Sequence, residues 1–169
     1  MSEFPLKPIT KNGVAAALEK AERYRLINDP SSAESICLDV LAVDPENQQA
    51  LVTLILAISD QSEEAPAAEY GRAMEALPRL TEEYKRVYYE GLICERRAKA
   101  HLAVGSPNVG EVAYDWLRRA MEHYERAEKI RPPGNDEPIL RWNTCVRILE
   151  RGKQHLRPSI PQEYEPSFE

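Results

Sequence analysis

The amino-acid sequence predicts an all-α fold, a right-handed α-solenoid of about three helix hairpins followed by a C-terminal capping helix. Three observations predict it. The spacing of small and bulky residues recurs along the chain, helix-start signals stand between the recurrences, and the intervening segments are rich in helix formers. The 169 residues suffice for one domain with its own core. We expect about seven helices.

The first hairpin is predicted over residues 14–47. Asp29 followed by Pro30 marks a helix start, because the aspartate accepts a hydrogen bond from the first turn and proline needs no N–H there. Asp44 followed by Pro45 predicts the next helix start by the same chemistry. The spacing of this hairpin is set by Ala21, Tyr24, Ala33, Cys37, Val40 and Pro45.

The second hairpin is predicted over residues 48–80 as a weaker copy of the first. Its closing proline, Pro78, arrives one residue early. The other small and bulky residues keep their offsets, so we expect the same helix–turn–helix plan. These residues are Ile55, Ile58, Ala67, Gly71 and Met74.

The third hairpin, over residues 81–134, is predicted to be the longest. Thr81 and the two glutamates after it mark its start. Between its two halves lie extra residues with strong helix propensity, and only the segment GSPNVG at residues 105–110 has turn chemistry. Both helices are therefore expected to be about two turns longer than their counterparts. The spacing residues are Gly91, Cys94, Ala120, Tyr124, Ala127 and Pro132.

The end of the chain is predicted as a capping helix over residues 136–156 and a tail over residues 157–169. The cap carries apolar residues in a loose helical rhythm. Three prolines exclude a helix in the tail. We consider the hypothesis that Tyr164 and Phe168 of the tail occupy a groove of the same or a neighbouring chain as a built-in ligand.

The repeated spacing resembles that of tetratricopeptide (TPR) repeats over residues 12–156, which leaves residues 1–11 as an N-terminal extension. The sequence departs from that family in three respects: no tryptophan opens a repeat, Ala21 and Ile55 replace a glycine, and the third hairpin is stretched. The resemblance implies a binding scaffold, in which a concave surface lined by the first helix of each hairpin binds a peptide or a helix of a partner.

That geometry implies a set of partner-binding residues on the first helices, since positions three or four apart share one helix stripe. Packing of hairpin against hairpin is the alternative role for each of them. Of the two adjacent tyrosines in the set, we expect at least one to be exposed. The implied residues are Arg25, Leu56, Lys85, Tyr88, Tyr89, Leu92, Arg96, Asn143 and Arg147, with Leu18, Glu22, Val52, Ser59 and Ile139 on the same stripes.

The family's clamp for acidic chaperone tails is not expected here. It depends on lysines, arginines and asparagines on the first helices, whereas the corresponding positions hold Leu18, Glu22, Val52 and Leu56. An amphipathic helix or an apolar segment of a partner fits these residues better.

Composition excludes several function classes. A net charge of −6 and a pI near 5.3 argue against nucleic acid as a partner. The chain has no apolar run near the roughly 20 residues of a membrane span and no signal-peptide pattern, and three scattered cysteines fit a reducing compartment, so we expect a cytoplasmic protein.

His101, His123 and His155 have no second ligand at helical spacing. We expect no metal, no cofactor and no enzymatic activity.

Two functions remain from the sequence. The first is an adaptor that binds another protein in the concave groove. The alternative is a self-associating structural subunit, a homo-oligomer formed through the long third hairpin, with Trp116 as a contact, or through the tail.

Overall fold

The structure is a computed structural model that describes residues 4–61, 66–105 and 107–159. Within these residues it is all-α, with seven α-helices, two short 3-10 helices and no strand, as the sequence predicts. The α-helices are α1 (Val14–Leu26), α2 (Pro30–Val43), α3 (Gln48–Asp60), α4 (Pro66–Ala76), α5 (Glu83–Val104), α6 (Val109–Ile130) and α7 (Glu137–Arg151), and the 3-10 helices are η1 (Lys11–Gly13) and η2 (Leu77–Arg79).

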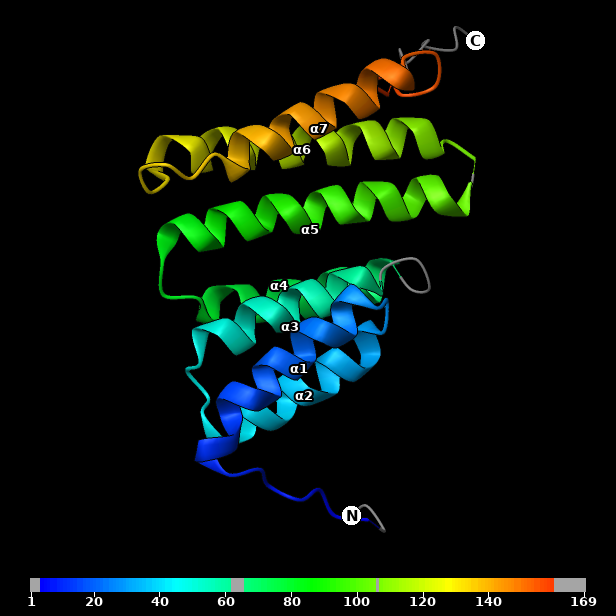
Figure 1. Cartoon of the computed structure of the whole chain (residues 1–169). Helices are drawn as coiled ribbons and strands as arrows, with labels where there is room; N and C mark the ends of the chain where they lie inside the picture. The colour runs from blue at the N-terminus through cyan, green and yellow to red at the C-terminus, as the bar shows by residue number, and fades with distance from the viewer. Residues whose placement is uncertain (1–3, 62–65, 106, 160–169) are drawn as a thin grey trace, which may run out of the picture.

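The helices pack in chain order. Figure 1 shows α1 and α2 at one end, α3 and α4 beside them, the long pair α5 and α6 next, and α7 across α6. The first helices of the hairpins also contact one another, α1 with α3 and α3 with α5. The most extensive helix contact is that of α5 with α6.

Small residues at the helix contacts explain this close packing, because they allow two helix axes to approach. One core cluster lies among α1 to α4 and a second among α5 to α7. Ile93 of α5 belongs to the first cluster, and Tyr89 packs against both, so α5 joins the two. The fully buried alanines include Ala21, Ala33, Ala50, Ala57, Ala98, Ala113, Ala120 and Ala127.

The predicted start of α2 is confirmed, but that of α3 is wrong. The Asp29 side chain accepts a hydrogen bond from the Ser32 amide at 3.2 Å, with Pro30 as the first helical residue. Asp44 instead ends α2, and α3 begins three residues after Pro45. Its cap is Asn47, whose side-chain oxygen accepts from the Ala50 amide at 2.9 Å.

Thr81 likewise does not cap the helix that follows it. Helix α5 begins at Glu83, and no side chain caps its N-terminus. The Thr81 amide donates to the side-chain oxygen of Gln48 at 2.9 Å, which ties this connection to the start of α3. Thr81 therefore joins the second hairpin to the third.

The predicted elongation of the third hairpin is confirmed. Helices α5 and α6 each contain 22 residues, against 13 in α1 and 14 in α2. Gly105 ends α5 in the left-handed conformation, with φ of 68°, which glycine adopts without a side-chain clash.

The capping helix α7 is shorter than predicted and ends at Arg151. The chain turns at Gly152, and the buried Leu156 side chain enters the second core cluster. A side chain at Gly110, near the start of α6, would collide with the backbone of His155, so this turn lies directly against α6. The proposed tail ligands, Tyr164 and Phe168, lie outside the described residues.

Candidate binding surface

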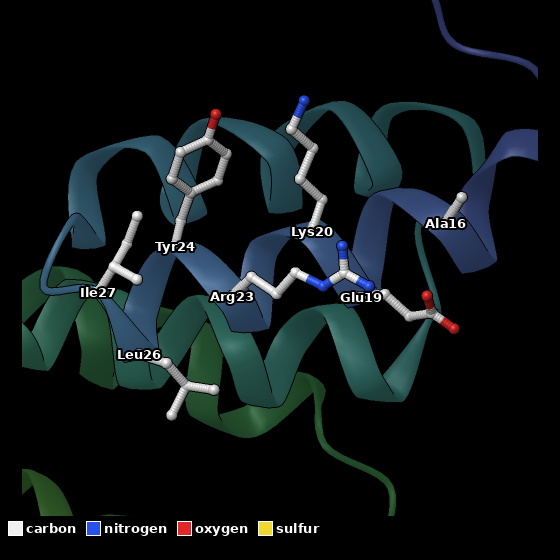
Figure 2. A pocket seen from close by; sticks show the side chains of 7 residues that line it. All are labelled: Ala16, Glu19, Lys20, Arg23, Tyr24, Leu26 and Ile27. Carbon is white, nitrogen blue, oxygen red and sulfur yellow. The ribbon is translucent and has the colours of Figure 1, made fainter.

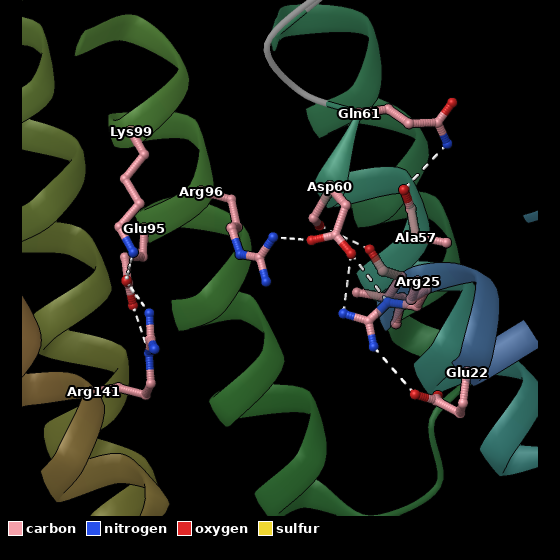
Figure 3. A network of polar contacts seen from close by, with 11 residues as sticks. Glu22, Arg25, Ala57, Asp60, Gln61, Glu95, Arg96, Lys99 and Arg141 are labelled. Atoms are coloured by element: carbon pink, nitrogen blue, oxygen red, sulfur yellow. Dashed lines mark hydrogen bonds and ion pairs between the residues drawn. The ribbon is translucent and has the colours of Figure 1, made fainter. Parts of the chain in front are cut away.

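The first helices of the hairpins and the capping helix carry a group of charged side chains that contact one another across the hairpins. We call this surface the first-helix face. Figure 3 shows the charged residues, which lie along α1, α3, α5 and α7. The face is defined by Glu22, Arg25, Leu56, Asp60, Tyr89, Glu95, Arg96, Lys99 and Arg141.

Asp60, at the end of α3, connects all three hairpins. One of its carboxylate oxygens accepts a hydrogen bond from the Arg25 Nε at 3.0 Å, and the other forms an ion pair with Arg96 of α5. Glu22 extends this group on α1. Its carboxylate lies 3.4 Å from the Arg25 guanidinium and accepts a hydrogen bond from the Thr53 hydroxyl at 2.7 Å. The ion pairs thus hold α1, α3 and α5 in a fixed relation.

Glu95 forms a second group on α5 and is fully buried. Its carboxylate accepts hydrogen bonds from the Tyr124 hydroxyl of α6 at 2.7 Å and from the Arg141 Nε of α7 at 2.9 Å. The Lys99 ammonium lies 2.6 Å from the same carboxylate. Burial raises the pKa of Glu95, but the hydrogen bonds and charges of Lys99 and Arg141, with the hydrogen bond from Tyr124, outweigh burial and lower the pKa below its ordinary value. Glu95 is therefore an ionised link between three helices.

Within the two ion-paired groups, positive charge exceeds negative charge by one, and Glu137 adds a further negative charge near Tyr89. Four cations share three carboxylates, and the side chains involved are mostly half-buried. Burial lowers the pKa of Arg96, and the nearby positive charges of Arg25 and Arg141 lower it further. A half-buried surface with surplus positive charge attracts a negatively charged group. The four cations are Arg25, Arg96, Lys99 and Arg141.

The structure corrects the expectation for the adjacent tyrosines. Tyr88 is buried, with its ring centroid 5.8 Å from that of Tyr84 and 5.9 Å from that of Tyr124. Tyr89 is half-buried between the two core clusters, edge-on to Tyr88 at 5.1 Å. Neither ring is exposed, because one faces α6 and the other fills the junction between hairpins.

The remaining predicted residues divide by accessibility. Leu92 is buried and presents no side chain to a partner, as is also true of Leu18 and Ser59. Arg147 is exposed, whereas Leu56, Lys85 and Asn143 are partly buried. Lys85 pairs with Glu82 at 2.7 Å, away from the shared groups. Arg25 and Arg96 of the predicted set are brought together by Asp60, and Glu22 also contacts Arg25.

Sequence reasoning missed the anions that organise the face. Asp60, Glu95 and their partners Tyr124 and Arg141 were not among the predicted site residues. The signal for Glu95 was present, because it stands among the buried positions of α5, beside Cys94 and four residues after Gly91. A carboxylate in the buried stripe of a helix requires a cation or a donor.

The cysteines serve as buried apolar residues. Cys37, Cys94 and Cys145 are buried, and burial raises the pKa of each thiol to about 12. The thiols therefore remain protonated at neutral pH, which disfavours a nucleophilic role. In the described segments, no group of three or more His, Cys, Asp or Glu side chains is arranged to hold a metal ion.

Trp116 lies at the junction of the second and third hairpins. Its ring packs edge-on against Tyr70 of α4 at 5.1 Å, and the guanidinium groups of Arg97 and Arg119 lie 4.7 Å from its centroid. The ring is partly buried by contacts within the chain. In this conformation Trp116 connects α4 to α6 instead of standing free on the long hairpin.

A second surface feature, on the outer side of α1, was not predicted. A shallow pocket of about 680 Å³ lies along this helix, and Figure 2 shows the side chains that line it. Leu26 and Ile27 at its end are 84% and 70% exposed. The hollow is lined by Ala16, Glu19, Lys20, Arg23, Tyr24, Leu26 and Ile27.

In comparisons with known proteins, no family model, no curated protein and no solved structure matches this chain. The observed class is therefore that of an all-α protein of packed helix hairpins with a charged face across its first helices. No helix in the described ranges is long and apolar enough to cross a membrane.

Proposed function

We propose that this protein is a TPR-like interaction adaptor, a right-handed solenoid that binds an acidic amphipathic peptide or helix of a partner protein on the first-helix face. One observation carries the proposal: on a chain of net charge −6, this face holds four cations on three carboxylates. Packing of the hairpins in chain order supports the solenoid arrangement.

The face is suited to binding because its charged side chains are already ordered. Arg25 and Arg96 are held by Asp60, and Arg141 by Glu95, so a partner does not need to immobilise them. Ordering of long side chains costs about 0.5–1.5 kcal/mol for each group on binding, and a preorganised surface avoids that cost. The same ion pairs fix the spacing of the hairpins.

Apolar contact comes from the middle of the face. Leu56 of α3 and Tyr89 of α5 are half-buried and retain accessible area. The unbalanced positive charge lies nearer α7, where Lys99 and Arg141 share Glu95. We infer that the bound segment places apolar side chains against α3 and α5 and carboxylates toward α7.

A peptide selection tests this function. The purified chain is immobilised, and a random peptide library is selected on it at low salt. Enriched peptides are expected to combine Asp or Glu with Leu or Phe. Leu56→Asp and Lys99→Gln are each expected to weaken the best peptide by about tenfold, equivalent to about 1.4 kcal/mol.

Matched controls lie on second helices. Leu38→Asp changes an exposed leucine of α2, and Lys129→Glu changes an exposed lysine of α6. Both controls should leave peptide affinity within about twofold. Peptides without acidic residues, or equal losses in the face variants and the controls, would refute binding at the first-helix face.

A further inference from the structure

The outer side of α1 is an apolar and charged helix face that no described residue from another element lines. It is separate from the first-helix face, to which α1 contributes Glu22 and Arg25. Tyr24 is half-buried, and the Lys20 ammonium lies 5.8 Å from the centroid of its ring. Leu26 and Ile27 at the end of this helix are exposed, and burial of their side chains against a partner would be favourable.

The order of residues along this helix face is self-complementary. A two-fold axis that lies between two antiparallel copies of α1, beside residues 21 and 22, places Glu19 opposite the second copy's Arg23, and the reverse. The same axis places small Ala16 opposite large Ile27, so that a large side chain meets a gap. The midpoints of the pairs Glu19–Arg23, Ala16–Ile27 and Lys20–Tyr24 all lie within half a residue of one position on the helix. Half a residue is less than about 1 Å along the helix axis, so one axis serves all three pairs.

Lys20 and Tyr24 extend to one side of the helix, while Glu19 and Arg23 lie in the middle of the view in Figure 2. A two-fold axis that lies in the plane of the contact, perpendicular to the helix, leaves each row on its own side. The Lys20 and Tyr24 row of one copy therefore faces the same row of the second copy. Lys20 then meets the ring of the second copy's Tyr24, a favourable cation–π arrangement. A single two-fold axis therefore pairs opposite charges, a large side chain with a small one, and each lysine with a tyrosine ring.

We propose that the outer face of α1 binds a second copy of this chain in an antiparallel two-fold contact. A single pair of helices buries less than the roughly 800 Å² per partner of a standard interface. The dimer is therefore weak, with a dissociation constant on the order of 100 µM. This inference does not depend on the proposed function of the first-helix face.

Sedimentation velocity from about 10 µM to 1 mM tests the contact in the full chain, a range that brackets the expected dissociation constant. The sedimentation coefficient of the wild type should rise with concentration. Ile27→Asp should weaken association at least about tenfold, because it places a carboxylate in the apolar contact. Leu38→Asp, an equally drastic change at an exposed leucine of α2, should leave association unchanged.

Charge exchange identifies the geometry. Glu19→Arg and Arg23→Glu should each weaken self-association, because each brings like charges together. An equimolar mixture of these two variants should associate more strongly than either alone, and a chain with both changes should recover wild-type association within about threefold. A monomer at all concentrations, or charge variants that behave as the wild type, would overturn the proposal.

Discussion

The hydroxyl of Tyr124 donates a 2.7 Å hydrogen bond to the carboxylate of Glu95, and both side chains are fully buried. The tyrosine comes from the second helix of the long hairpin and the glutamate from the first. Arg141 of the capping helix completes the group. This contact joins three helices through polar groups inside an otherwise apolar cluster, so its loss should affect the whole C-terminal half.

Tyr124→Phe should destabilise the protein by about 1.5–3 kcal/mol, the range for a buried hydrogen bond to a charged group. The ring and its packing remain, and only the donor to Glu95 is lost. Urea unfolding followed by circular dichroism measures the change. Tyr114→Phe, a partly exposed tyrosine on the same helix, is the control and should stay within about 0.5 kcal/mol. Equal effects would contradict the role of the hydrogen bond.

Stability should fall in acid partly because of Glu95. Its pKa is lower in the folded chain than in the unfolded chain, so its contribution is complete above the unfolded value of about 4.3. That contribution is lost as the pH falls through the lower, folded pKa. Urea unfolding of wild type and Glu95→Gln between pH 7 and pH 3 should show a steeper loss in the wild type. Parallel curves would mean that Glu95 does not titrate with folding.

Gly91→Ala and Gly71→Ala should have opposite effects. A Cβ at Gly91 would lie 2.9 Å from Cε1 of the buried Tyr124 ring and 3.1 Å from the Cβ of His123, whereas nothing lies within 4 Å of a Cβ at Gly71. The first change should cost about 1–3 kcal/mol through overpacking. The second should stabilise α4 by about 0.5–1 kcal/mol, because alanine favours a helix interior.

Thermal unfolding of the two glycine variants provides the comparison. The two melting temperatures should move in opposite directions from the wild type. A neutral Gly91→Ala would show that α5 and α6 can separate enough to accept a methyl group.

Asp60→Ala should destabilise the junction of the three hairpins by about 1–3 kcal/mol, between the values for exposed and buried ion pairs. The change leaves Arg25 and Arg96 with the positive charges that Asp60 had balanced. A double-mutant cycle with Arg96→Ala, measured by urea unfolding, should give a coupling of about 0.5–3 kcal/mol. The coupling energy should decrease at high salt, because salt screens the ion pair. If the losses of the two single variants simply add in the double variant, Asp60 and Arg96 do not stabilise the fold through their ion pair.

The sequence identified the helices well where local chemistry sets them. The Asp29 and Pro30 start depends only on neighbouring backbone groups, and Gly105 ends α5 because the left-handed conformation suits glycine. The failure at Asp44 has a physical cause. The same Asp-Pro pair also fits a turn after a helix, and Asn47 provides the cap of α3 instead.

The candidate site was less predictable. Periodicity placed Arg25 and Arg96 on first-helix stripes, but it could not show that both contact Asp60, because the partners are 35 and 36 residues away in sequence. It also placed Tyr88 and Leu92 on an accessible stripe. Both are buried in the packed structure, Tyr88 against the Tyr124 ring of α6.

By itself, the sequence determined the all-α class, the seven helices and the elongation of the third hairpin, since these follow from backbone preferences and residue spacing within a few turns. Tertiary structure alone decided which charges meet. Ion pairs between hairpins depend on helix rotation and separation, which follow from side-chain contacts between residues far apart in sequence. The partners of the Glu95 carboxylate, Tyr124 and Arg141, and the outer face of α1 followed only from the packing of the helices.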